Sequence, residues 1–358
     1  MTITKRQFEA AEMLSEALNG EGLARERAVR RLQEAISTSD IPVQLGPAMT
    51  SILMASYNEV ATSWTEYARK IVVDDFESSE LYTFEFKDPE IAGVNDGEPF
   101  YSGGLAGLGE LDEYPVISLE ASGVRVKTRK AGVQIALSWE AIRRNGKINL
   151  IREALTDFGK RVKKNENYQA ASQLVGPDGV RAHWTNRAEG NPELSLGALE
   201  ASFINLATLT DAKGRRITSP SQYVLVVPPA LKPIADGILG IGRLTRTDAE
   251  GNTYEMNNPV AGKISKAVEV PEIGTIAGAS ADKAWFLLPT ANELPLPHVA
   301  NVFLSGEESP RVFVKKDTNS SPEDGSYDND SYATKVRHFV SGAFGTADAT
   351  IVSDGSGS

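Results

Sequence analysis

The chain has 358 residues, of which 41% are hydrophobic and 24% are charged, with a formal net charge of −11 and no cysteine. This balance predicts a globular protein with two or three subdomains and excludes disulfides, thiolate metal sites and cysteine nucleophiles. The negative charge argues against a protein whose main role is to grip nucleic acid, although it leaves room for a local basic surface. No apolar run is long enough for a membrane span or an export signal. We therefore expect synthesis and folding in a cytoplasm.

The N-terminal region is predicted to be helical. Two short amphipathic helices are expected at about residues 4–19 and 23–36, and neither can bury its apolar stripe alone. A third is expected at about residues 48–68, with an apolar side formed by Ile52, Leu53, Tyr57, Val60, Trp64 and Tyr67. The pattern predicts either a helical subdomain or an arm that packs on a neighbouring chain.

Residues 81–137 change from helical to strand periodicity. Tyr82 and Phe84 alternate with polar residues, as do Val124 and Val126 later in the segment, so we expect the two legs of a long hairpin. The glycines and prolines of residues 98–115 predict an extended tip. Its glycines superficially resemble a phosphate-binding loop, but no strand-then-helix unit surrounds them, and we expect no nucleotide site.

Residues 138–175 form the longest stretch without a strong break, and we expect one long helix there. Leu155, Phe158 and Val162 recur at the spacing of one helix face, and Gly176-Pro177 ends the pattern. Gly159 would weaken this helix unless a close packing contact requires it. The helix is expected to be the structural spine of the chain.

From about residue 194 the pattern becomes mixed α/β. A helix is expected at about residues 196–209, a buried strand at Tyr223–Val227 and a further helix from Pro229. Further strands are expected at residues 266–270, 284–288 and 311–315, followed by an acidic loop at residues 317–332 without calcium-loop spacing. The chain closes with two strand-like runs broken at Gly345 and a Gly/Ser tail.

Charge is divided sharply along the middle of the chain. Residues 74–120 hold thirteen acidic residues and one lysine, a net charge of −12, whereas residues 125–164 hold twelve basic and three acidic residues, a net charge of +9. The two segments are either ordinary solvated faces or complementary surfaces of neighbouring copies. In the second case an acidic hairpin tip lies near basic residues of an adjacent copy. The candidates for this interface are Glu110, Asp112, Glu113, Arg143, Arg144, Lys163 and Lys164.

Residue patterns typical of catalysis are missing from the sequence. His183, His298 and His338 are isolated and lack metal-ligand spacing, and no serine lies in a nucleophile-elbow motif. The many carboxylates lie in segments that are expected to be exposed, where burial does not raise a carboxyl pKa. We therefore expect no enzyme, no cofactor and no metal.

The order of these elements carries a family resemblance. The segment before the long helix has Ile135, Ser138, Glu140, Ile142 and Asn145, and LSLGALEAS is followed by DAKGRRITSPSQYVLVVPPALKPIA, then by KAWFLLP and VRHFVSGAFGTADATIVSDG. This order resembles the tailed-phage major capsid proteins of the Hong Kong-97-type fold, and the subtype resembles the Mu-like major head subunit. The resemblance spans about residues 45–355, and its patterns are loose.

The resemblance implies an α+β fold in five parts. They are an N-terminal helical arm (1–77), an extended β-hairpin loop (78–137), a peripheral domain with the spine helix (138–194), an axial domain (195–304), and strands that return to these domains before a C-terminal tail (305–358). Such subunits form hexamers and pentamers that close into an icosahedral shell around double-stranded DNA. Some relatives form an isopeptide cross-link from the extended loop, but Lys87, the only lysine between residues 74 and 120, lies on a hairpin leg.

The partners implied by the resemblance are further copies of the chain, scaffold, portal and decoration proteins, and packaged DNA bound without sequence preference. No membrane is expected. Assembly would take place in the host bacterial cytoplasm and the product would be the virion capsid, with residues 1–40 kept in the mature particle. Three alternatives stay open: an encapsulin-like nanocompartment shell, a ring-forming tail or head-completion protein, and a soluble hydrolase with an unrecognised site.

Overall fold

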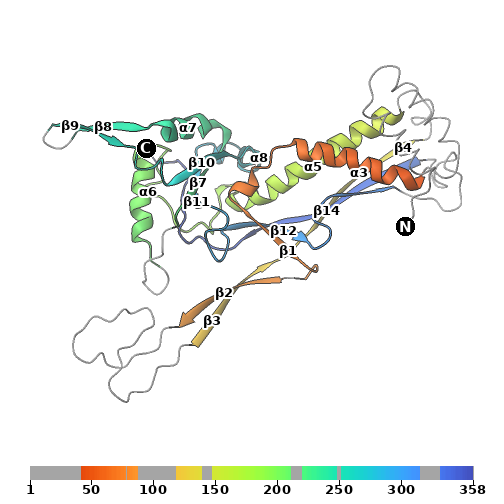
Figure 1. Ribbon diagram of the computed structural model, residues 1–358, viewed down its shortest axis with the longest axis horizontal. Coiled ribbons are helices and arrows are strands. Elements are labelled where there is room, and N and C mark those ends of the chain that lie inside the picture. The colour runs from red at the N-terminus through yellow and green to blue at the C-terminus, as the bar shows by residue number, and fades with distance from the viewer. Residues whose placement is uncertain are drawn as a thin grey trace, which may run out of the picture.

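The computed structural model describes residues 42–77, 79–87, 118–138, 147–210, 220–247, 251–314 and 331–357. The fold is mixed α+β, with two sheets, a long helix that runs from one sheet to the other, and a projecting two-stranded arm (Figure 1). The two helices predicted before residue 37, the hairpin tip and the acidic loop at residues 317–332 fall outside the described residues, apart from the last two residues of that loop.

The long helix, α5 (Lys147–Leu174), packs along α3 (Pro42–Glu59), as Figure 1 shows. Leu53 of α3 and Leu155 of α5 are buried in the shared core. A Cβ on Gly159 would lie 2.5 Å from the carbonyl oxygen of Leu53, so this glycine permits the close approach of the two helices. Of the two possibilities that the sequence left for Gly159, a weakened helix or a close packing contact, the structure shows the close packing contact.

The predicted boundaries of two helices differ from the structure. The helix expected at about residues 48–68 begins earlier, at Pro42, and ends at Glu59, and Trp64 begins a short 3-10 turn, η1 (Trp64–Glu66). The long helix expected within residues 138–175 begins at Lys147 and ends at Leu174, just before the stop predicted at Gly176-Pro177. Before it, residues 130–137 alternate between apolar and polar in the manner of a strand, and they form one.

That strand belongs to the outer sheet, which has the order β1-β12-β14-β13, with β4 on the other edge of β14. β1 and β12 are parallel and the other pairs are antiparallel. Val133, Val312 and Val336 contribute to the core beneath α3 and α5. The strands are β1 (Arg69–Val73), β4 (Lys130–Ser138), β12 (Val299–Leu304), β13 (Arg311–Val314) and β14 (Ser331–Phe344).

The projecting arm consists of β2 (Ser79–Lys87) and β3 (Ser118–Val126), which pair from Ser79↔Val126 to Lys87↔Ser118. The predicted hairpin legs are thus confirmed, except that residues beyond Val126 leave the hairpin for the outer sheet. Val73, Val126 and Val302 form a small core where the arm meets the body. Figure 1 shows the arm pointing away from both sheets.

The inner sheet has the order β10-β7-β11-β15 and carries the largest apolar core. All residues of β7 and β11 are buried, because helices cover both faces of the sheet. The strands are β7 (Tyr223–Val227), β10 (Ile264–Glu269), β11 (Trp285–Pro289) and β15 (Ile351–Ser353), and the helical segments around them are α6 (Leu196–Thr208), η2 (Pro229–Leu231), α7 (Lys232–Gly240), α8 (Glu272–Ala277) and η3 (Gly278–Ala281). The helices and strands predicted from residue 196 onward are confirmed within two residues at most ends.

Two small hairpins complete the described structure. β5 (Val175–Gly176) pairs with β6 (Gly179–Val180), directly after α5. β8 (Arg243–Thr247) pairs with β9 (Thr253–Asn257) and projects from the inner-sheet end with most side chains exposed (Figure 1). The C-terminal segment is not the free tail that the Gly/Ser composition predicts, since the Gly357 amide donates to the Asn191 carbonyl at 2.8 Å.

Candidate functional site

The predicted interface residues are only partly within the described structure. Glu110, Asp112, Glu113, Arg143 and Arg144 lie outside the described residues, so the structure does not place the acidic tip or the first two arginines. The two lysines of the prediction both lie on α5, where Lys164 is exposed and Lys163 is buried.

Lys163 points into the subunit. Its ammonium nitrogen lies 3.1 Å from Oε2 of Glu166 and 3.3 Å from the hydroxyl oxygen of Tyr57. The nitrogen also lies 4.4 Å from the centre of the Tyr57 ring. The side chains of Lys163 and Glu166 are only 10% and 1% exposed. Lys163 is therefore used in a contact within one chain and is not a candidate for a surface contact with a neighbour.

Glu166 is the centre of a polar cluster that joins four elements. Oε1 of its carboxylate accepts the Tyr57 hydroxyl of α3 at 2.5 Å and lies 3.5 Å from Nε2 of His338 on β14. Oε2 accepts the Trp64 indole N–H of η1 at 3.3 Å in addition to Lys163. We call Tyr57, Trp64, Lys163, Glu166 and His338 the Glu166 cluster. It holds together α3, η1, α5 and the outer sheet.

The environment of the cluster sets the protonation states of two members. Burial, followed by the charge of Glu166 and the hydrogen bond to it, raises the pKa of Tyr57, so the phenol stays a donor at neutral pH. Burial lowers the pKa of His338, although the neighbouring Glu166 opposes that shift. His338 is therefore neutral at pH 7, and the cluster contains one cation and one anion, Lys163 and Glu166.

The basic segment of the chain is paired in part within the subunit where it is described. Arg125 binds Glu80 at 2.9 Å, Lys160 binds Glu59 at 3.2 Å, and Arg161 binds Asp157 one helical turn earlier. These pairs are exposed, and each stabilises the fold by about 0–1 kcal/mol at most. Part of the charge division seen in the sequence is thus satisfied inside one chain.

Apolar side chains are exposed at both ends of the molecule. Val72, Phe76 and Tyr82 are exposed where the arm leaves the outer sheet. Ile204 on α6 is 67% exposed at the inner-sheet end, which also exposes Tyr254 on β9. Large exposed apolar residues that gather near projecting elements are typical of surfaces that contact another protein.

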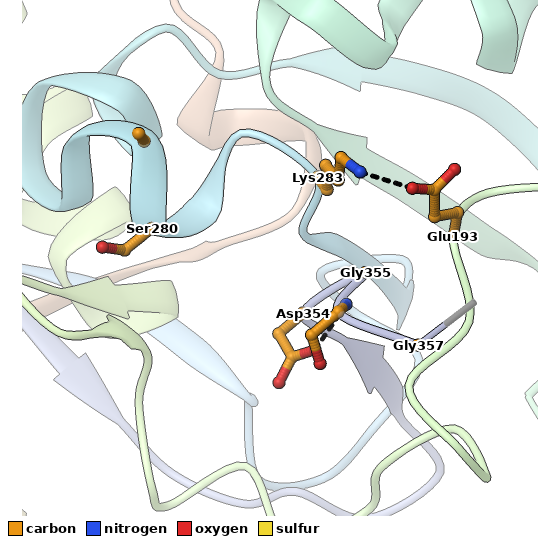
Figure 2. Close-up of a pocket in the computed structure, with 8 residues that line it drawn as sticks. Glu193, Ser280, Lys283, Asp354, Gly355 and Gly357 are labelled. Atoms are coloured by element: carbon orange, nitrogen blue, oxygen red, sulfur yellow. Dashed lines mark hydrogen bonds and ion pairs between the residues drawn. The ribbon is translucent and has the colours of Figure 1, made fainter.

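A cavity of about 370 Å³ lies beside the C-terminal segment. Figure 2 shows the ion pair between Lys283 and Glu193 on one side and Asp354 on the other. Asp354 accepts the Ser356 amide at 2.9 Å. Among the described lining residues, none has a buried polar atom without a hydrogen-bond partner, so nothing in the cavity indicates a particular ligand.

The three histidines have different surroundings. His183 stacks on Phe344 with 3.8 Å between ring centres, and His298 is fully buried at the start of β12. In the parts of the chain that the structure describes, no group of three His, Cys, Asp or Glu side chains is placed to hold a metal ion. None of the described helices combines the length and apolar character that a membrane span requires.

A comparison with protein families bears on the role of these surfaces. A family model described as "Phage capsid protein" matches residues 121–352, which include α5, the outer sheet apart from β1, and the inner sheet up to Val352. The chain belongs to the phage capsid protein family. This membership indicates a structural role in the virion capsid. A comparison with the curated proteins found no match.

The chain also resembles solved structures at low sequence identity. One is the virus-like particle from Pyrococcus furiosus, with 10% identity and a TM-score of 0.43 over 85% of this chain and 97% of that one. Another is the acidic stable capsid of Helicobacter pylori bacteriophage KHP30, with 8% identity and a TM-score of 0.47 over 80% and 86%. A third, described as Gordonia phage Cozz, has 14% identity and a TM-score of 0.42 over 85% of each chain.

The Glu166 cluster was not predicted from the sequence of this capsid protein. Asn165–Asn167 read as a polar gap in the apolar face of the long helix. A signal was present, since Val162, Glu166 and Ala170 are spaced four residues apart and share one helix face. An acidic residue between two apolar residues on a buried face indicates a carboxylate that needs partners.

Proposed function

We propose that this protein is the major capsid subunit of a tailed phage, which self-assembles as hexamers and pentamers into an icosahedral shell around double-stranded DNA. The family match over residues 121–352 is the observation that carries the proposal. In this proposal the fold is of the Hong Kong-97 type and the subtype is Mu-like. The partners are further copies of the chain, scaffold, portal and decoration proteins, and packaged DNA.

The arrangement of the described elements supports a subunit that is completed by its neighbours. The β2–β3 arm and the β8–β9 hairpin project from opposite regions of the body, and each contacts little of its own chain. Exposed apolar residues lie beside both, as expected if neighbouring copies cover them. We assign the β2–β3 arm to the extended loop, but not β4, which falls within residues 78–137 and lies in the outer sheet. We assign α5 to the spine of a peripheral domain and residues 195–304 to an axial domain.

Electron microscopy of the purified full-length protein tests the proposal directly. The expected result is closed particles of uniform diameter, formed by the protein alone or with its scaffold. A monomer by ultracentrifugation at every salt concentration, with the scaffold protein present, would contradict it. If closed particles form and enclose a cargo enzyme rather than DNA, the protein is an encapsulin-like shell instead.

We also propose that charge sets the register between neighbours. The acidic tip residues Glu110, Asp112 and Glu113 would lie near basic residues of an adjacent copy. Of the basic candidates, we retain Arg143, Arg144 and Lys164, because the ammonium of Lys163 is bound to Glu166 inside the subunit. Each exposed pair contributes only about 0–1 kcal/mol, but a shell repeats every contact many times.

Charge reversal tests this register. Arg143→Glu with Arg144→Glu should block assembly, and Asp112→Lys with Glu113→Lys in the same chain should partly restore it. The matched control is Arg161→Glu, which changes the charge of a residue that already pairs with Asp157 in its own helix. Empty shells of normal shape that fail only to retain DNA would instead place these arginines against the packaged DNA.

A further inference from the structure

The arrangement of the Glu166 cluster is not explained by a contribution to folding stability alone. Burying an ion pair such as Lys163–Glu166 removes both charges from water, and apolar residues of the same size are often as stable in such a position. The cluster also places the imidazole of His338 beside the pair, at a depth where this side chain is 1% exposed. A buried histidine next to a buried ion pair makes the local free energy depend on pH.

Tyr57 and His338 meet at one oxygen atom. Oε1 of Glu166 accepts the Tyr57 hydroxyl at 2.5 Å and lies 3.5 Å from Nε2 of His338. Nε2 of His338 also lies 3.1 Å from the backbone carbonyl oxygen of Glu308. Tyr57 is the member of the cluster that α3 contributes. The attachment of α3 through Tyr57 therefore depends on the charges around this one oxygen.

Protonation of His338 would destabilise the arrangement that the structure shows. In neutral His338, Nε2–H donates to the Glu308 carbonyl, while Nδ1 is buried and has no hydrogen-bond partner. Protonation would turn Nδ1 into a buried donor without an acceptor, and it would put a second cation beside Lys163. Both effects favour a state in which α3 has moved away from α5 and the outer sheet, so that water reaches the imidazole. We call this the open state.

The groups that face His338 come from the elements packed around it, and β4, the strand beside it, places the uncharged Ala131 opposite His338. α5 contributes Glu166 and Lys163, and α3 contributes the Tyr57 phenol. β12 contributes the Phe303 ring, 5.8 Å from the imidazole. The segment after β12 presents the Glu308 backbone, while the Glu308 carboxylate pairs with Lys70 of β1 at 3.1 Å. Glu166 favours the charged form of His338 and Lys163 disfavours it, but burial has the larger effect and disfavours a charge on the imidazole.

We propose that His338, Glu166 and Tyr57 form a proton-sensitive latch that holds α3 against α5 and the outer sheet at neutral pH and releases it in acid. The latch lies within one subunit, so it operates whether or not the subunit assembles. Its release would free α3 together with the chain that precedes it, while the inner sheet stays folded. The lowered pKa of His338 is consistent with this direction, because the open state then binds the proton more tightly.

Hydrogen exchange of the full-length protein, measured between pH 7 and pH 5 and corrected for intrinsic rates, tests the latch. Exchange in residues 49–59 of α3 should accelerate as the pH falls, by at most about tenfold per pH unit below about pH 6.5. Exchange in β7 should stay unchanged over the same range. His338→Gln should remove the acceleration, whereas the control His183→Gln, on a half-buried histidine bonded to the Gln173 carbonyl, should keep it.

Tyr57→Phe provides a second variant in case His338→Gln does not fold. It removes only the hydroxyl that Glu166 accepts and keeps the ring beneath Lys163. Exchange in α3 should then be at least about tenfold faster already at pH 7, as expected for the loss of the hydrogen bonds that this hydroxyl makes with Glu166 and Lys163. The latch is overturned if α3 and β7 accelerate together in acid, if His338→Gln keeps the native pH dependence, or if Tyr57→Phe leaves α3 exchange unchanged.

Discussion

The inner sheet and the Glu166 cluster are both buried, but the first is made of apolar side chains and the second of polar and charged ones. In the inner sheet, Val226 of β7 and Phe286 of β11 pair directly and are both fully buried, with apolar side chains on every side. In the cluster, the buried residues are a glutamate, a lysine and a histidine that bind one another. The first region is stabilised by removing apolar surface from water, and the second depends on every polar partner being present.

The difference predicts how each region responds to change. An apolar core loses free energy in proportion to the atoms removed, and its response does not depend on pH. A buried polar cluster tolerates the loss of all its charges better than the loss of one, and it responds to protons. Substitutions that separate these two behaviours test whether the comparison is correct.

The largest effect is expected at Glu166. Glu166→Ala leaves Lys163 buried without a counter-charge and should lower the free energy of unfolding by about 3–5 kcal/mol. Urea denaturation of the unassembled protein measures this change. The control is the double variant Glu166→Leu with Lys163→Met, which removes both charges and should recover most of the loss. A double variant as unstable as Glu166→Ala would show that the ion pair itself stabilises the fold.

The inner sheet should show a smaller, pH-independent loss. Leu225 is completely buried in the core between β7 and the helices that cover it. Leu225→Ala should lower the free energy of unfolding by about 3 kcal/mol at both pH 7 and pH 5, because it leaves an apolar cavity. Thr245→Ala, on the exposed β8 strand, serves as the control and should change it by less than about 0.5 kcal/mol. A loss at Leu225 that varies with pH would remove the distinction between the two regions.

The contrast between the two regions also explains which parts of the structure could be predicted from the sequence. The inner sheet was predicted because runs such as Tyr223–Val227 are apolar over their whole length and end at prolines or turns, and such runs form buried strands. Gly159 could be identified as a weak point of the long helix unless close packing uses it, because glycine lowers helix stability. In both cases the evidence lies in residues that are neighbours in the chain.

The outer sheet was harder to predict because its strands depend on distant partners. β12 was not predicted, since Asn301 interrupts its apolar run. The Asn301 side chain donates a hydrogen bond to the backbone carbonyl of Glu166, and this distant contact fixes the position of the strand. β4 was assigned to the hairpin because its pairing with β14 joins residues about 200 positions apart, which local periodicity does not reveal. The Glu166 cluster was missed for the same reason, as Tyr57 and Glu166 are 109 positions apart.

A third prediction uses pH to distinguish buried histidines from the apolar core. Burial lowers the pKa of His298 to about 4, below its unfolded value of about 6.5. The unfolded chain thus binds the proton first, so this contribution to stability is complete above pH 6.5 and is lost as the pH falls toward 4. The loss should be about 3 kcal/mol, from roughly 2.5 pH units at 1.36 kcal/mol each. Urea denaturation at several pH values measures it.

His298→Phe is the matched variant for that measurement. It keeps an aromatic ring of similar size in the buried position and removes the titratable group. The dependence of the unfolding free energy on pH should become shallower. The pH dependence that remains should come from other groups such as His338, because burial also lowers the pKa of that histidine. An unchanged slope in His298→Phe would mean that His298 does not titrate in this range.

The smallest effect is expected where α3 crosses α5. Gly159→Ala would place a Cβ 2.5 Å from the carbonyl oxygen of Leu53, and backbone atoms have little room to move. The helix propensity of alanine favours the substitution by up to about 1 kcal/mol, but overpacking of this kind typically costs about 1–3 kcal/mol, so the net change should be destabilising. Gly237→Ala in α7 is the control, because nothing lies within 4 Å of a Cβ there and the same propensity should act alone. Gly237→Ala should therefore be neutral or stabilising. If both substitutions stabilise the protein, α3 does not pack as closely on α5 as Gly159 indicates, and the position of Tyr57 at Glu166 loses its support from helix packing.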